Sequence, residues 1–169
     1  MGPAIQRRVS FTGEHISCLD PQRRLVLPKA WRQPDPEENV FTLMAPDKPC
    51  IHMLPPAMME RFYERLQARL LTEEDGLIDA GSLGRMAADI ACDKQGRFAL
   101  TSELMAHAGI EDRVVMVGNF VSIAIWAPDV WAAHRKSLSE GNRAMREMLR
   151  QPDALAQAVQ QALKPQAAP

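Results

Sequence analysis

The chain carries the same sequence pattern twice, and this internal repeat constrains its fold more than any other feature. In each copy an Asp lies four residues before an Arg, and segments of alternating apolar and polar residues flank the pair. The two pairs, separated by 73 positions, are Asp20 with Arg24 and Asp93 with Arg97. A pattern repeated at a fixed period marks a repeated supersecondary unit. The sequence therefore predicts two copies of one such unit.

The similarity of the two copies continues beyond the Asp and the Arg. Each pair is followed by a short helix candidate, an apolar run, a strand with a period of two, and a helix that begins at a proline. In the second copy, Thr101 can cap the start of the short helix and Gly109 can end it. The matching segments are residues 29–32 and 102–108, 40–44 and 114–117, 51–53 and 123–125, and the helices from Pro56 and Pro128. Each copy thus predicts the order β-β-α-β-β-α, and the chain a β-rich α+β fold.

Composition limits the class of protein. With 169 residues, of which 46% are hydrophobic, the chain can form one or two small domains. No apolar run approaches the ~18 residues of a membrane-spanning helix, and the basic N-terminus lacks the apolar segment of a secretory signal. The three cysteines, Cys18, Cys50 and Cys92, form no Cys-x-x-Cys motif. They favour a reduced, cytoplasmic protein with buried thiols.

Charge is distributed unevenly, although the formal net charge is only −1. Residues 1–32 have a net charge of +4, residues 33–90 of −6, and residues 133–169 of +3. Basic charge is therefore concentrated around the first Asp–Arg pair. Such a chain can bind an anionic surface with one face while it stays soluble, so the charge pattern is compatible with a nucleic-acid partner.

The second Asp–Arg pair has the signature of a β-hairpin. The segment Asp93-Lys-Gln-Gly96 predicts a type I turn followed by a left-handed glycine, because Asp accepts backbone N–H groups and Gly adopts positive φ without steric cost. Lys94 and Gln95 should project from the tip, with Arg97 at the base of the returning strand. Such a tip offers charge for phosphates and hydrogen-bonding groups for base edges.

Two alternatives to nucleic-acid binding stay open for this motif. Charged turns are common simply because turns are solvated, and the Asp–Arg spacing is also compatible with a structural ion pair across a bulge. In either case, strand alternation places one set of side chains inside the protein. These are Leu25 and Leu27 in the first copy, and Phe98 and Leu100 in the second.

The remaining constellations do not indicate an enzyme. Cys50 and His52 share one face of a predicted strand, but zinc takes four ligands and no second pair is suitably spaced. Gly76, Gly81 and Gly84 lack the Gly-Lys-Ser/Thr ending of a phosphate loop. No nucleophile motif is present either. We therefore expect no catalytic activity, no metal site and no cofactor.

The repeated motifs resemble those of the MraZ family. The resemblance spans about residues 11–138 and is carried by the segments Gly13 to Pro28, Asp93 to Arg97 and Val117 to Trp126. Its units are similar to the SpoVT/AbrB type of DNA-binding β domain. The resemblance implies two tandem units packed as an intrachain pseudo-dimer, a swapped-hairpin-type barrel. It also implies a bacterial transcriptional regulator of the division and cell-wall gene cluster, acting as a ring-shaped homo-oligomer on repeated DNA sites.

The motif positions indicate which residues contact DNA and which shape the turns. We expect the DNA contacts to come from Arg23, Arg24, Lys94, Gln95 and Arg97. The residues expected to structure the turns are Asp20, Asp93 and Gly96. The first copy departs from the family pattern because it has Pro21-Gln-Arg23 where a Lys-Gly pair usually precedes the Arg. Either Arg23 takes the left-handed position of Gly96, or Pro21 reshapes the turn and Arg23 is relaxed.

The sequence predicts four segments and two kinds of partner. The segments are a first SpoVT/AbrB-like unit with its helix over residues 11–71, a connecting segment over 72–87, a second unit over 88–138, and a helical or partly disordered tail over 139–169. The expected partners are double-stranded promoter DNA and other copies of the chain, with no membrane and no small-molecule substrate. The expected location is the cytoplasm, at the nucleoid. The rival hypothesis is an oligomeric protein-interaction scaffold that has lost DNA binding, which the degenerate first turn and the tail favour.

Overall fold

The computed structural model describes residues 9–70 and 76–137. Its contacts divide the chain into two compact units, residues 1–130 and 131–169. Residues 131–137, the described part of the second unit, belong to a helix that begins three residues earlier, at Pro128, as the sequence predicts. The predicted tail over residues 139–169 lies outside the described residues.

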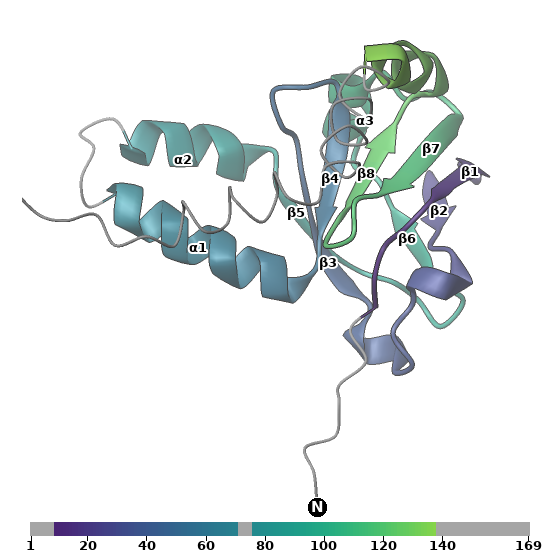
Figure 1. Cartoon of the computed structure of the whole chain (residues 1–169), viewed down its shortest axis with the longest axis horizontal. Coiled ribbons are helices and arrows are strands. Elements are labelled where there is room, and N and C mark those ends of the chain that lie inside the picture. Colours follow the sequence, from purple (N-terminus) through teal and green to yellow (C-terminus); the bar gives the residue numbers. More distant parts are fainter. Residues whose placement is uncertain (1–8, 71–75, 138–169) are drawn as a thin grey trace, which may run out of the picture. The chain divides into compact units, whose positions relative to one another are not determined.

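The described part of the first unit is an α+β fold of antiparallel strands, which confirms the predicted fold class (Figure 1). Its strands are β1 (Glu14–Cys18), β2 (Arg24–Val26), β3 (Val40–Met44), β4 (Cys50–Leu54), β5 (Ala88–Ala91), β6 (Arg97–Ala99), β7 (Arg113–Gly118) and β8 (Ile123–Trp126). Its α-helices are α1 (Pro56–Leu70), α2 (Gly76–Arg85) and α3 (Ser102–Ala108). Two short 3-10 turns are η1 (Lys29–Trp31) and η2 (Pro36–Glu38).

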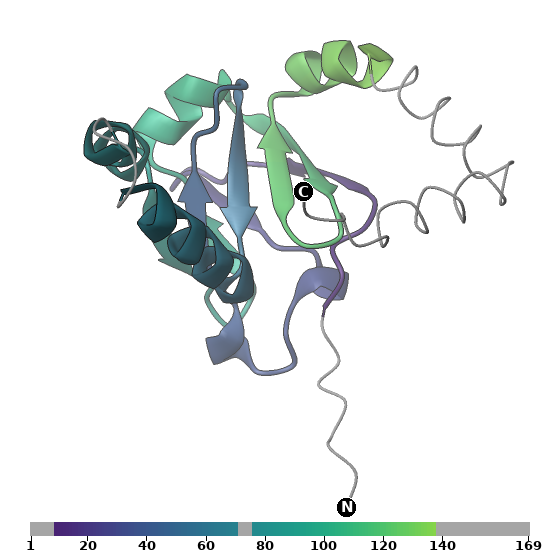
Figure 2. The same ribbon diagram turned by 60° about the vertical axis from the view of Figure 1, so that its left-hand side comes forward.

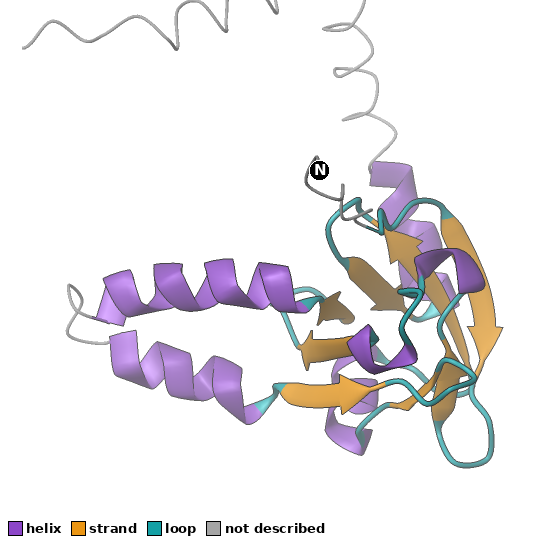
Figure 3. Ribbon diagram, turned by 90° about the horizontal axis from the view of Figure 1, so that it is seen from below, coloured by secondary structure: helices purple, strands orange, loops and turns teal. Residues whose placement is uncertain are grey.

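Two helical elements differ from the predicted order. The first short helix is only the 3-10 turn η1, because Pro34 and Pro36 follow it closely and a proline cannot continue helical hydrogen bonding. Helix α2 lies in the connecting segment, for which the sequence predicts no helix. It runs beside α1, and the two helices extend away from the strands (Figures 1 and 3). In the part of the chain that the structure describes, no helix is both long and apolar enough to cross a bilayer.

The two repeats pair with each other in both sheets. The six-stranded sheet has the order β1-β7-β8-β4-β3-β5, and β2 pairs with β6 as a two-stranded ribbon. Strand β1 of the first repeat pairs with β7 of the second, and β3 of the first pairs with β5 of the second. In the middle of the sheet β4 lies beside β8, blue beside green in Figure 2. Because strands of each repeat need partners from the other, neither repeat completes its sheet alone.

The ribbon of β2 and β6 buries one of its faces in the hydrophobic core. Its buried side chains are at most 4% exposed, and they are Leu25, Leu27, Phe98 and Leu100. This confirms the predicted alternation in both copies. Trp31 of η1 packs into the same core, and its Nε1–H donates to the carbonyl oxygen of Thr12 at 3.2 Å. The opposite face of the ribbon is consequently left toward solvent.

Helix α3 has the two ends that the sequence predicts. The Oγ1 of Thr101 accepts the backbone N–H of Leu104 at 3.2 Å, which satisfies a donor that has no partner within the helix. Gly109 ends the helix with a φ of +62°, a left-handed conformation that suits glycine. This helix follows β6 directly, so its capping fixes where the second ribbon strand stops.

The prediction of three buried thiols is wrong for one cysteine. Cys50 and Cys92 are buried, and burial raises the pKa of each thiol to about 11. Cys18 is exposed, because it ends the edge strand β1, whose alternation leaves Glu14, Ile16 and Cys18 on the open side. Ile16 on this side is 69% exposed, so the outer surface of β1 is partly apolar.

Candidate nucleic-acid interface

Two turns with the same hydrogen-bond pattern precede the ribbon strands β2 and β6. In each turn the Asp Oδ1 accepts the backbone N–H groups of the residues two and four positions ahead, a pattern for which the short Asp side chain is suited. All four bonds measure 2.9 Å, from Gln22 and Arg24 to Asp20, and from Gln95 and Arg97 to Asp93. The departure from the family pattern in the first copy has therefore left the geometry of its turn unchanged.

The second oxygen of each carboxylate pairs with an arginine. Arg24 Nε lies 2.7 Å from Asp20 Oδ2, and Arg97 Nε lies 2.6 Å from Asp93 Oδ2. The structural ion pair that the spacing allowed is thus present in both copies. It does not bury the arginines, because their side chains stay 30% and 35% exposed. Each guanidinium is held by its Nε edge and still reaches solvent.

The same contacts lower the pKa of both aspartates below the ordinary value of 3.8. The largest cause is the hydrogen bond from the backbone N–H of Arg24 or Arg97, and the bond from the guanidinium acts in the same direction. Partial desolvation opposes the shift. Both carboxylates therefore carry their charge throughout the neutral range, and the ion pairs stay intact there.

Arg23 adopts the left-handed conformation. Its φ is +57°, and the corresponding glycine of the second turn, Gly96, has a φ of +80°. The alternative in which Pro21 reshapes the turn and relaxes Arg23 is therefore wrong. A residue with a Cβ is destabilised in this conformation by roughly 1–2 kcal/mol. The guanidinium of Arg23 donates through Nη1 to the hydroxyl of Ser102, at the start of α3 in the second repeat.

The left-handed residues join the two repeats. The carbonyl oxygen of Arg23 accepts the N–H of Leu100 at 3.1 Å, and that of Gly96 accepts the N–H of Leu27 at 2.8 Å. These bonds extend the β2–β6 pairing, in which Leu25 lies opposite Phe98. Since the strands are antiparallel and a turn precedes each of them, the two turns lie at opposite ends of one ribbon. The ribbon and its turns form one continuous surface contributed by both repeats.

The outward face of this ribbon carries a pair of arginines. Arg24 and Arg97 project from it together with the exposed Val26 and Ala99. The structure thus brings the predicted residues to three places: Arg24 and Arg97 on the ribbon, Lys94 and Gln95 at the exposed second tip, and Arg23 at the first tip. The first and second tips do not meet, because the length of the ribbon separates them.

Arg32 is a basic residue at the second turn that the motif does not reveal. Its Nε donates to the carbonyl oxygen of Leu27 at 2.7 Å. Its guanidinium packs on Gly96 so closely that a Cβ at that position would lie 2.4 Å from Arg32 Cζ. One difference between the two copies points to Arg32. The equivalent position of the second copy, 73 residues later, holds Met105 instead of an arginine.

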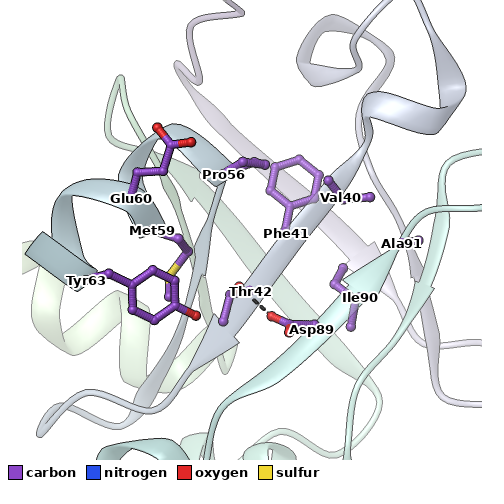
Figure 4. A pocket seen from close by; sticks show the side chains of 10 residues that line it. All are labelled: Val40, Phe41, Thr42, Pro56, Met59, Glu60, Tyr63, Asp89, Ile90 and Ala91. Carbon is purple, nitrogen blue, oxygen red and sulfur yellow. Dashed lines mark hydrogen bonds between the residues drawn. The ribbon is translucent and has the colours of Figure 1, made fainter. Parts of the chain in front are cut away.

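A second surface feature is an apolar groove of about 510 Å³ between α1, β3 and the edge strand β5 (Figure 4). Within it, the hydroxyl of Thr42 donates to Asp89 Oδ1 at 2.6 Å, the dashed line in Figure 4. Most of the other side chains are apolar, so the groove suits an apolar partner better than a chemical reaction. The lining residues are Val40, Phe41, Thr42, Pro56, Met59, Glu60, Tyr63, Asp89, Ile90 and Ala91.

The pair Cys50 and His52 lies in the central strand β4. Burial lowers the pKa of His52, and the positive charge of Lys48 acts in the same direction. Within residues 9–70 and 76–137, no three His, Cys, Asp or Glu side chains are grouped so that they could hold a metal ion. The basic ribbon is therefore the candidate site that the structure supports best.

Comparisons with known proteins agree on one family. The family model described as "MraZ protein, putative antitoxin-like" matches residues 85–151. A Lachnoclostridium phytofermentans protein named "Transcriptional regulator MraZ" is 30% identical over 128 residues, which cover 73% of this chain and 86% of that relative. Proteins of the same name from Clostridium beijerinckii and Heliobacterium modesticaldum are 28% and 27% identical, over 75% and 82% of this chain and 88% and 96% of their own lengths.

The lowered aspartate pKa values predict a pH-dependent stability. A carboxyl whose pKa is lower in the folded than in the unfolded state stabilises the fold above its unfolded pKa, and this contribution disappears as the pH falls through the folded value. We expect Asp93→Asn, which keeps an acceptor but loses the charge, to be less stable than the wild type at pH 7. The difference should shrink as the pH falls below 3.8. Urea unfolding between pH 7 and pH 2 measures it.

Asp20→Asn serves as the matched variant for this experiment, because its carboxylate makes the same bonds and should show the same pH window. A stability difference that stayed constant down to pH 2 would contradict the prediction, since the lost contact would then not depend on charge.

The left-handed φ of Arg23 predicts that a glycine there is more stable than an alanine. Arg23→Gly and Arg23→Ala both lose the bond to Ser102, but only the alanine retains the strain of positive φ. We expect the glycine variant to exceed the alanine variant by about 1 kcal/mol and to match or exceed the wild type. Thermal unfolding of the three proteins measures the order. An alanine variant as stable as the glycine variant would mean that position 23 is not strained.

Proposed function

Because the chain belongs to the MraZ family, we propose that it is a transcriptional regulator that binds double-stranded DNA through the β2–β6 ribbon and its two turns. We further propose that it acts on the division and cell-wall gene cluster, as a ring-shaped homo-oligomer on repeated promoter sites. A protein with this function works in the cytoplasm, at the nucleoid.

The observation that carries this proposal is the ribbon itself. A two-stranded antiparallel ribbon fits the major groove of B-DNA, which is about 12 Å wide. The outward face of β2 and β6 bears Arg24 and Arg97, while their inward face is buried in the core. A rigid ribbon with two guanidiniums on its open face and a basic turn at each end matches the shape and charge of that groove.

Each predicted residue has a place in this arrangement. Arg24 and Arg97 are held through Nε, and their remaining N–H groups suit the O6 and N7 acceptors of guanine or a phosphate. Lys94 and Gln95 at the second tip, and Arg23 at the first, suit the backbone phosphates on either side. Asp20 and Asp93 act indirectly, because they position the turns and the arginines.

The pairing between repeats supports two tandem SpoVT/AbrB-like units, over residues 11–71 and 88–138, packed as a pseudo-dimer. The first strand of each repeat pairs with the third strand of the other, and the second strands pair with each other. The bonds between the turns obey the same exchange, since position 27 bonds to position 96 and position 100 to position 23. We propose that residues 72–87 connect the units and that 139–169 form a separate tail.

Assembly into an oligomer offsets the weakness of a single site. A chain of net charge −1 offers few phosphate contacts, whereas linked copies on matched DNA repeats can raise avidity by up to ~10²–10⁴. The exposed apolar surface supports self-association. Phe120 and Val121, in the turn after β7, are 72% and 52% exposed, and the groove beside β5 is lined mainly by apolar side chains.

The degenerate first turn and the tail are the two features that favour the rival hypothesis of a scaffold without DNA binding. That turn has the same bonds as the second one, so the changed sequence is no longer an argument for lost binding. The two functions are separated by a gel shift of the full chain on the DNA upstream of its own gene, at two salt concentrations. Specific binding that weakens steeply with salt is expected, and binding no stronger than to unrelated DNA would favour the scaffold.

Arg97→Ala should weaken binding to this DNA by ~1–3 kcal/mol if the arginine contacts a base through two hydrogen bonds. The matched variant Asp93→Asn breaks the same ion pair but keeps the arginine, so it should lose less affinity than Arg97→Ala. Arg65→Ala, which removes an exposed charge from α1, controls for net charge. If Arg97→Ala and Asp93→Asn lost the same affinity, Arg97 would act only through the structure of the turn.

We expect the full chain to be a homo-oligomer at micromolar concentration, because a monomer would leave Phe120, Val121 and the apolar groove exposed to water. Light scattering coupled to size exclusion gives the mass of the particle. A mass equal to the 18.9 kDa of one chain would refute the ring.

A further inference from the structure

We propose that Arg32 supplies to the second turn the additional guanidinium that Arg23 supplies to the first. Each turn then presents two guanidiniums to the DNA, although the two turns differ in sequence. This inference rests on the proposed DNA binding and names further groups of the same site.

The position of Arg32 is the first argument. It belongs to the first repeat, but its guanidinium lies on Gly96 of the second repeat, on the side from which a side chain at position 96 would emerge. A Cβ at position 96 would lie 2.4 Å from both Cζ and Nε of Arg32. Gly96 therefore does two things at once. It accepts a φ of +80°, and it leaves the space that the guanidinium of Arg32 occupies.

The exchange of residue types between the repeats is the second argument. The left-handed position holds arginine in the first turn and glycine in the second, whereas the position 73 residues apart at 32 and 105 holds arginine and then methionine. Met105 and Arg23 line the same surface hollow beside the first turn. At the first turn the left-handed residue, Arg23, is the cation and the neighbouring Met105 is uncharged. At the second turn the left-handed Gly96 is uncharged and the neighbouring Arg32 is the cation.

Arg32 also has donors to spare for an anion. Its Nε bond to the carbonyl of Leu27 uses one of the five N–H donors of a guanidinium and fixes the direction of the side chain. Leu27 in turn donates its own N–H to the carbonyl of Gly96 at 2.8 Å. This short chain of bonds holds Arg32 against the turn that also carries Lys94 and Arg97. Planar guanidiniums in fixed positions are well suited to phosphate oxygens.

The test compares three variants of the full chain on the DNA upstream of its own gene over a range of salt concentrations. Arg32→Gln keeps an N–H donor for Leu27 but removes the charge, and it should lose about tenfold in affinity, with the salt slope lower by at least about one. The double variant Arg32→Ala with Gly96→Arg moves the guanidinium to the left-handed position, as in the first turn. It should regain most of the affinity and the slope. Arg65→Ala should leave both unchanged.

Each possible result supports or overturns the role of Arg32. If Arg32→Gln bound like the wild type, or if it lost affinity and thermal stability with an unchanged salt slope, Arg32 would not contact DNA. The same conclusion would follow if the double variant regained nothing while remaining folded by circular dichroism. In all of these cases the wild type still binds, and the proposed function stands. A wild type that bound no double-stranded DNA would overturn the function and this inference together.

Discussion

The candidate site depends on one set of carboxylate hydrogen bonds, which occurs in both turns. Asp20 and Asp93 each accept two backbone N–H groups through one oxygen and an arginine Nε through the other. These bonds close a turn in which the residue three positions after the aspartate adopts a left-handed conformation. That conformation directs the carbonyl of the residue at the leucine N–H of the opposite repeat. A local interaction over four residues thus leads to the association of segments more than 70 residues apart.

The arginines of this ribbon each pair with a carboxylate and also keep a charge available for DNA, two roles that often conflict. Ion pairing with an acidic neighbour usually neutralises an arginine and weakens its attraction for phosphate. Here the carboxylate contacts only the Nε of Arg24 and Arg97, and about a third of each side chain stays exposed. The ion pair therefore orders the guanidinium before a ligand arrives, which reduces the entropy lost on binding.

Differences between the repeats are as informative as their similarity. Identical repeats would place the same residue at positions 23 and 96, and at positions 32 and 105, but the chain holds arginine at only one position of each pair. Arg23 is strained at a φ of +57° and bonds to Ser102 across the ribbon, whereas Gly96 is relaxed and packs beneath Arg32. The two turns share one backbone geometry. The additional guanidinium comes from the turn's own repeat in the first turn and from the other repeat in the second.

The amino-acid pattern alone specifies the elements whose causes are local. The Asp turns, the caps of α3 and the inward Leu25 and Phe98 follow from hydrogen bonds and alternation within a few residues. The fold decides which strands become neighbours, because β1 meets β7 about 100 positions away and no local pattern encodes that choice. For the same reason only the tertiary structure places Arg32 on Gly96. It also decides which of the two possible conformations Arg23 adopts, because bonds to the second repeat hold this residue in the strained, left-handed one.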